Sequence, residues 1–168
     1  FCIHTRYSTQ QAILEDIVAS LYAQGMRKLI ILSGHGGNNF KGMIRDLAFV
    51  YPDFLIIAAD WFSIVPPKDY FEAVVDDHAG ESETSVMMHY HPELVNLAEA
   101  GDGESRPFAI PSLNEKVGWA PRHWDKATVD SGVGNPKKAS AEKGERYMKP
   151  VVEKLAKLFT EVGLGSLY

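Results

Sequence analysis

A histidine set among glycines is the residue of this chain best placed to do chemistry. His35 lies in the run Ser33-Gly-His-Gly-Gly-Asn-Asn39, directly after the apolar stretch 28–32. That stretch predicts a strand covered on both faces, as in a parallel sheet. The glycines keep bulk away from the imidazole, and open α/β sheets bind ligands at the carboxyl ends of their strands. We therefore predict that His35 meets a metal ion or an acyl substrate; the alternative is a histidine that only pins its loop.

A second group of titratable residues lies just before and within the start of a predicted helix. It comprises Asp76, Asp77, His78, Glu81 and Glu83. Carboxylates at a helix N-terminus are stabilised by the macrodipole, so capping accounts for Glu81. Glu83 follows two residues later and faces another side of the helix, so it also suits a hard-metal ligand or a general base. Capping and chemistry both stay open for Glu83 at this point.

Other candidates follow the second apolar stretch and the end of the predicted helix. Asp60 and Trp61 come directly after the apolar run 54–59. They are placed to bind substrate at the same sheet edge as His35, although Trp61 equally suits the core or a subunit contact. His89 and His91 flank the end of that helix, where histidine satisfies terminal carbonyls, so we interpret them as structural.

The elements that must position these residues follow a β–α–β order. Two apolar strands with a helix between them predict a parallel pair joined by a right-handed crossover. The last helix should be kinked or divided at Pro150. Long ordered loops are expected over 99–136, where His123 and Trp124 would form a pocket wall or an interface. The predicted helices span 8–25, 40–50, 70–75, 83–90 and 140–162, and the first begins with a capping box at Ser8.

Composition and charge narrow the classes of function. The 168 residues are 45% hydrophobic with a net charge of -5, which predicts a single globular domain over 1–168. The sequence has no cluster of basic residues and no apolar stretch of membrane-span length, which argues against nucleic acid and membrane as partners. The single cysteine, Cys2, has no activating neighbour and permits no intrachain disulfide, in keeping with a cytoplasmic location. Because the chain opens at Phe1 without a preceding strand, we expect that an amino-terminal piece is missing.

Three segments taken together resemble the creatininase (creatinine amidohydrolase) family. They are the glycine-flanked run 33–39, the run His78-Ala-Gly-Glu-Ser-Glu-Thr-Ser85, and the run 132–144. The resemblance implies a three-layer α/β/α fold with a mostly parallel central sheet. It also implies two divalent metal ions per complete subunit, either zinc, manganese or iron, a small-molecule amide substrate, and a homo-oligomer such as a hexamer.

The resemblance assigns roles to individual residues. His35 matches a metal-binding histidine, and Glu83 matches a glutamate that binds metal or its water and can carry a proton. His78 matches a histidine held near the substrate as a proton shuttle or oxyanion partner. The implied reaction is hydrolysis of a non-peptide C–N bond, in a small cyclic amide or a formamide, by a metal-activated water.

Two departures from the family pattern leave alternatives open. Nothing in the chain matches the family's amino-terminal Glu-x-His pair and bridging aspartate, so the chain alone is predicted to be incomplete as an enzyme. Gly36 and Gly37 stand where creatininase itself carries Tyr-Glu, which argues against creatinine as the substrate; relatives hydrolyse a formamide or a peptide. The alternative function is a non-catalytic binding or assembly subunit that retains the fold. A sugar- or nucleotide-handling protein is disfavoured, because no phosphate-binding glycine pattern opens a helix.

Overall fold

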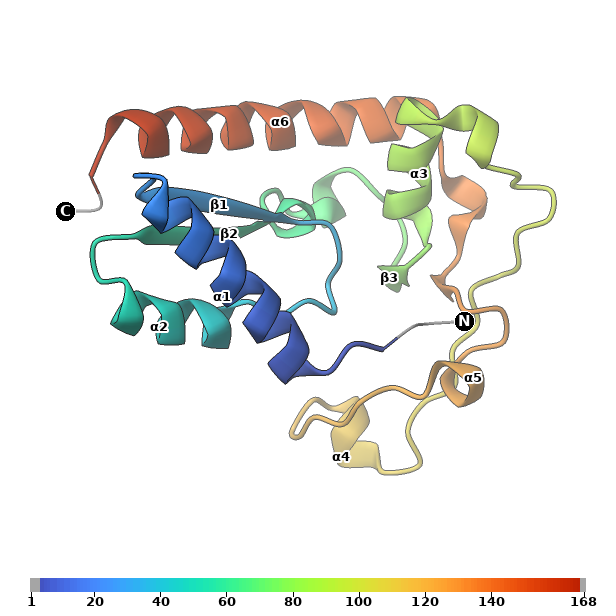
Figure 1. Cartoon of the computed structure of the whole chain (residues 1–168). Helices are drawn as coiled ribbons and strands as arrows, with labels where there is room; N and C mark the ends of the chain where they lie inside the picture. The colour runs from blue at the N-terminus through green and yellow to red at the C-terminus, as the bar shows by residue number, and fades with distance from the viewer. Residues whose placement is uncertain (1–3, 167–168) are drawn as a thin grey trace. The chain divides into compact units, whose positions relative to one another are not determined.

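A computed structural model describes residues 4–166, which form two compact units (Figure 1). The first unit consists of Phe1–Ile64 and Glu153–Tyr168, and the second unit is Val65–Val152. Each unit is described by itself below. A single domain over the whole chain stays a prediction.

A parallel strand pair organises the first unit. Strand β1 (Lys28–Ser33) pairs with β2 (Leu55–Asp60), and the register sets Ser33 opposite Asp60. Helix α2 (Lys41–Val50) connects the two strands, as the β–α–β order predicts. Helix α1 (Tyr7–Ala23) precedes β1 and is followed by Gly25, whose φ of 86° suits glycine at a helix end. The two strands therefore end level with each other at one edge.

The core of the first unit lies under one face of the strand pair. Helices α1 and α2 cover that face, and the part of α6 (Ala141–Leu164) that begins at Glu153 runs along the other (Figure 1). The Lys28 ammonium joins this part of α6 to β1 by donating to the carbonyl oxygen of Val162. The unit thus has the predicted α/β/α layer order. Its buried core residues are Leu14, Val18, Met43, Leu47, Phe54 and Ile56.

Two expectations for the first unit are wrong. β1 is not fully buried, although helices lie on both faces of the strand pair: Leu32 is 50% exposed, and within residues 4–166 the only strand that pairs with β1 is β2. The capping box at Ser8 does not form, because α1 begins at Tyr7 and Ser8 already lies inside the helix. Arg6 is the N-cap residue and makes no side-chain capping bond.

The second unit combines α3 (Glu81–Tyr90), the start of α6 and a two-stranded antiparallel ladder of β3 (Asp76–His78) and β4 (Val133–Gly134). The remaining residues form long segments with short helices, as expected for 99–136. Across these segments an isolated antiparallel bridge pairs Ser105 with Thr128. The short helices are η1 (Trp61–Ser63, in the first unit), η2 (Pro67–Asp69), η3 (Pro92–Leu94), α4 (Pro111–Asn114), α5 (Trp124–Ala127) and η4 (Pro136–Lys138).

Close packing of α3 against α6 holds the second unit together. A Cβ on Gly144 would overlap the carbonyl oxygen of Ser85, so glycine permits the two helices to approach. The buried Ser85 hydroxyl donates to the Glu81 carbonyl oxygen at 2.6 Å and accepts from the Ser140 amide at 3.1 Å. Tyr147, 1% exposed, donates to the Val65 carbonyl oxygen at 3.2 Å, and burial raises the pKa of its phenol.

Two helix predictions in the second unit are corrected. Residues 70–75 are not helical, because the amides of Glu72 and Ala73 donate to the Glu81 carboxylate instead of to helical carbonyls. Pro150 does not divide the last helix, because α6 is continuous from Ala141 to Leu164, while the predicted kink stays a prediction. Val151, next to the proline, is fully buried. Burial of such a side chain contributes about 1.5–3 kcal/mol, which offsets much of the cost of a proline inside a helix.

Candidate active site

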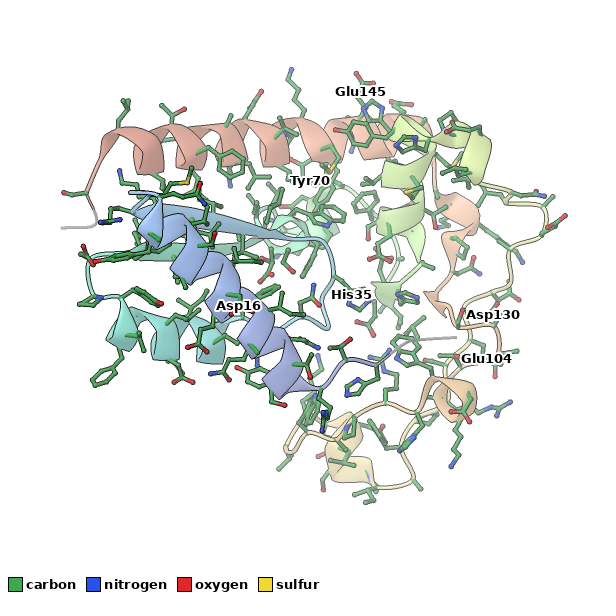
Figure 2. All side chains as sticks on the ribbon, in the orientation of Figure 1. Asp16, His35, Tyr70, Glu104, Asp130 and Glu145 are labelled. Carbon is green, nitrogen blue, oxygen red and sulfur yellow. The ribbon has the colours of Figure 1, made fainter. Side chains whose placement is uncertain are left out.

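Residues of the first candidate cluster gather where the two parallel strands end. His35, labelled in Figure 2, follows β1 by two residues. Asp60 ends β2 and Trp61 opens η1. Because Ser33 and Asp60 are paired in register, the predicted placement of these residues at one sheet edge is confirmed. The Ser33 hydroxyl, almost fully buried, donates to the His35 carbonyl oxygen at 3.3 Å and so helps to fix the loop.

The His35 ring is held by the glycines that follow it. Its Nδ1 atom accepts a hydrogen bond from the Gly37 amide at 2.9 Å. A Cβ on Gly37 would lie 3.0 Å from both Cε1 and Nδ1 of the ring, so a larger residue would push the imidazole away. With Nδ1 accepting, the neutral ring carries its proton on Nε2. A ligand histidine normally donates from the nitrogen that does not bind the metal, so metal binding through Nε2 requires the Gly37 contact to rearrange.

The second candidate cluster lies where β3 leads into α3. The His78 Nδ1 atom is 4.0 Å from Oε2 of Glu83, and that same oxygen accepts from the Ala79 amide at 2.7 Å. Ala79 adopts φ of 50°, a left-handed conformation that is uncommon for a residue other than glycine. Glu83 thus combines the two interpretations left open by the sequence: it satisfies a main-chain donor and lies beside a histidine.

Side chains from a distant segment support His78. The Trp124 ring lies against the His78 ring, with centroids 4.9 Å apart. The Arg122 guanidinium lies 4.7 Å from the centroid of the Trp124 ring and donates to Asp77 at 2.5 Å. Asp77 and His78 are therefore both contacted by the segment that contains α5. Trp124 packs against the His78 ring, and its predicted role as a pocket wall or an interface residue stays a prediction.

A buried carboxylate anchors the start of α3. Glu81 is fully buried; its Oε2 accepts from the amides of Glu72 and Ala73, and its Oε1 accepts from the Lys143 ammonium at 2.5 Å. Glu81 and then Glu72 raise the pKa of Lys143. Asp76 accepts from the Ser82 amide, and burial raises the pKa of its carboxyl. The sequence pointed to capping for Glu81 and gave no signal of this buried ion pair.

The structure brings some predicted residues together and leaves others in separate units. His78 and Glu83 are neighbours in the second unit, while His35, Asp60 and Trp61 belong to the first. Within residues 4–166, no group of three or more His, Cys, Asp or Glu side chains is arranged to hold a metal ion. Cys2 lies outside the described residues. The joint metal site of His35 and Glu83 therefore stays a prediction.

Comparison with known proteins decides the family. The creatininase family profile, described as creatinine amidohydrolase, matches residues 1–159. The chain belongs to the creatininase family. Among curated relatives, a mycofactocin precursor peptide peptidase of Mycobacterium ulcerans (strain Agy99) is 32% identical over 131 residues, which cover 75% of this chain and 45% of that protein. A creatinine amidohydrolase of Pseudomonas putida is 24% identical over 169 residues, which cover 92% of this chain and 63% of the relative.

Solved structures confirm the α/β fold of the creatininase family. A crystal structure of a putative creatinine amidohydrolase from Bacteroides fragilis NCTC 9343 is 83% identical with a TM-score of 0.96, and the match covers all of this chain and 66% of that one. Two creatininases, a Zn-Zn form of a mutant and a manganese form, share the fold with TM-scores of 0.68 and 0.70 at 22% and 21% identity. The chain thus spans about half to two thirds of the length of these proteins. No helix in the described part of the chain is long and apolar enough to cross a membrane.

Proposed function

We propose that the protein is a divalent-metal-dependent amidohydrolase that cleaves a C–N bond of a small cyclic amide or a formamide. Membership of the creatininase family supports amide hydrolysis, and the zinc and manganese forms of proteins with this fold support a divalent metal. The observation that carries the proposal is the His78–Glu83 pair at the start of α3, backed by Trp124. A histidine and a carboxylate in such a pair can pass a proton between water and a leaving nitrogen.

Each residue has a proposed role. His35 is a metal ligand, and Glu83 binds the metal or its water and carries a proton. When bound, a pair of divalent ions would polarise the amide carbonyl and lower the pKa of water. His78 lies near the substrate as a proton shuttle or oxyanion partner, held by Trp124. Asp60 and Trp61 bind substrate at the sheet edge next to His35.

A peptide is the second candidate substrate. The mycofactocin precursor peptide peptidase is 32% identical to this chain, compared with 24% for the creatinine amidohydrolase. Gly36 and Gly37 stand where creatininase carries larger side chains, which argues for a substrate other than creatinine. Lactams, formamides and short peptides should therefore be tested side by side.

Metal content and turnover of the full-length protein test this function. We expect about two divalent ions per subunit by elemental analysis, and metal-dependent release of an amine or acid from one substrate class. His35→Ala should lower metal occupancy, whereas His78→Ala should retain metal and turn over more slowly. If the protein held no metal after purification in excess divalent metal, the proposal would be contradicted. Wild-type metal content and rate in both His35→Ala and His78→Ala would contradict it as well. Metal or amide binding without turnover would instead favour a non-catalytic subunit.

Assembly and location extend the proposal. The family resemblance implies a homo-oligomer, such as a hexamer, and the single cysteine is in keeping with a cytoplasmic location. Size-exclusion chromatography with light scattering measures the subunit number directly. A monomer at the concentration used for the activity assays would contradict the predicted assembly but would not contradict the proposed amide hydrolysis.

A further inference from the structure

An unusually basic cavity lies in the second unit beside the His78 site. Its volume is about 620 Å³, within the range of small-molecule sites. The walls are the segments around 105–109 and 122–127, and the lining includes Arg106, Arg122, His123 and Lys126 but no Asp or Glu. Glu104, which directly precedes the first wall and is labelled in Figure 2, is not among the lining residues. In a chain with 22 acidic and 17 basic residues, a lining with four basic residues and no acidic one is unexpected.

The cations of this cavity are only partly neutralised by the protein. Arg122 forms an ion pair with Asp77. Arg106 and Lys126 form no ion pair with any residue of the described chain. Two cations facing one concave space without a counter-charge favour an anionic occupant, because guanidinium and ammonium groups bind carboxylate and phosphate oxygens strongly.

Main-chain hydrogen bonds hold the walls in place. The Arg106 amide donates to the Ala127 carbonyl oxygen at 2.7 Å, which joins the two segments. The Asn114 side chain accepts from the Phe108 amide at 2.9 Å and donates to the Phe108 carbonyl oxygen at 2.8 Å, which closes the loop that bears this phenyl ring. Phe108 and the buried Val133 supply apolar lining between the charges. The cavity therefore combines apolar and cationic lining residues.

We propose that this cavity binds an organic anion, a carboxylate or phosphate on an apolar body, through Arg106 and Lys126. Arg122 lines the cavity and stacks on Trp124, and the Trp124 ring contacts His78. The Trp124 ring thus lies between the cavity residue Arg122 and the imidazole of His78, the proposed proton shuttle. Identification of the anion as the far end of the amide substrate rests on the proposed function, whereas the binding itself does not.

Binding of 3-phenylpropanoate and of its neutral counterpart 3-phenylpropan-1-ol tests the cavity. Neither compound has a C–N bond, so hydrolysis cannot interfere. We expect calorimetric titration of the full-length protein to show tighter binding of the acid, weakened by salt. The double variant Arg106→Gln/Lys126→Gln should raise the Kd of the acid about tenfold and leave the alcohol unchanged. Arg106→Lys should retain most of the affinity.

Lys149→Gln is the matched control, because Lys149 is an exposed lysine of α6 in the same unit and does not line the cavity. Equal affinity for acid and alcohol, no binding of the acid, or an equal loss in the control would overturn the proposal. Acid binding that is lost in the double variant supports the site even if no amide is hydrolysed, in which case the proposed function alone fails. Amide hydrolysis without binding of the acid would contradict the proposed anion site and support the proposed function.

Discussion

Replacement of Lys143 by methionine isolates the energetic role of the buried carboxylate at the start of α3. Within residues 4–166, the Lys143 ammonium is the one charged donor to Glu81, which also accepts from two main-chain amides. The Glu81 side chain is 0% exposed and that of Lys143 is 20% exposed. Methionine keeps the length and apolar surface of the lysine stem but removes the charge. The variant therefore leaves a buried carboxylate without its counter-ion.

The expected loss follows from these contacts. Removal of one partner of a fully buried ion pair costs about 3–5 kcal/mol, and a hydrogen bond to a charged group contributes about 1.5–3 kcal/mol. Because Glu81 keeps two amide donors and Lys143 is partly exposed, the loss should fall below the first range and within the second. We expect Lys143→Met to lower the free energy of unfolding by about 2–3 kcal/mol.

Urea unfolding at fixed protein concentration and neutral pH measures this loss. Lys138→Met is the matched control, because Lys138 pairs with Glu72 through a side chain that is 65% exposed, and exposed pairs contribute about 0–1 kcal/mol. The double variant Glu81→Met/Lys143→Met should recover part of the loss, because no charge is then left buried. A Lys143→Met effect no larger than that of Lys138→Met would refute the claim that Glu81 depends on its counter-ion.

Three further predictions concern acid stability, helix packing and the histidine loop. Hydrogen bonds from two lysines lower the pKa of Glu72 from 4.5 to about 2, so its stabilising contribution is present above pH 4.5 and lost as the pH falls toward 2. The stability difference between wild type and Glu72→Gln should shrink over that range in urea titrations, and a constant difference would contradict this. Gly144→Ala should destabilise the protein by about 1–3 kcal/mol in thermal or urea unfolding, because its methyl group meets the Ser85 carbonyl oxygen; a neutral substitution would show that the helices can separate at little cost. Gly37→Ala should displace the His35 ring and change its imidazole ¹⁵N chemical shifts, and unchanged shifts would refute the close contact.

Local signals in the sequence predicted much of the first unit. The β–α–β order, the helix from 40 to 50 and the stop at Gly25 all follow from apolar periodicity and backbone preferences, and all are confirmed. The positions of His35 and Asp60 at one sheet edge also follow, because parallel strands end on the same side. The predictions that failed here, the capping box at Ser8 and full burial of β1, depended on which atoms come near in space.

The second unit was harder to predict because its contacts join residues far apart in the chain. Residues 70–75 were expected to be helical, yet two of their amides bind the carboxylate of Glu81. Trp124 was predicted only to form a pocket wall or an interface. Its contact with His78 spans a long loop, and no periodic pattern in the sequence indicates that contact. The basic cavity is likewise built from segments that no motif connects.

The sequence by itself determined which side chains are candidates for the chemistry. It singled out His35 among glycines, and His78 and Glu83 at a helix start, because residue type and spacing along one segment set the local backbone. Tertiary structure alone decided which charges are buried and what pairs with them: Glu81 meets Lys143 across 62 positions, and Arg122 meets Asp77 across 45. A charge leaves water only where the folded chain supplies a partner, and the choice of that partner is a property of three-dimensional packing.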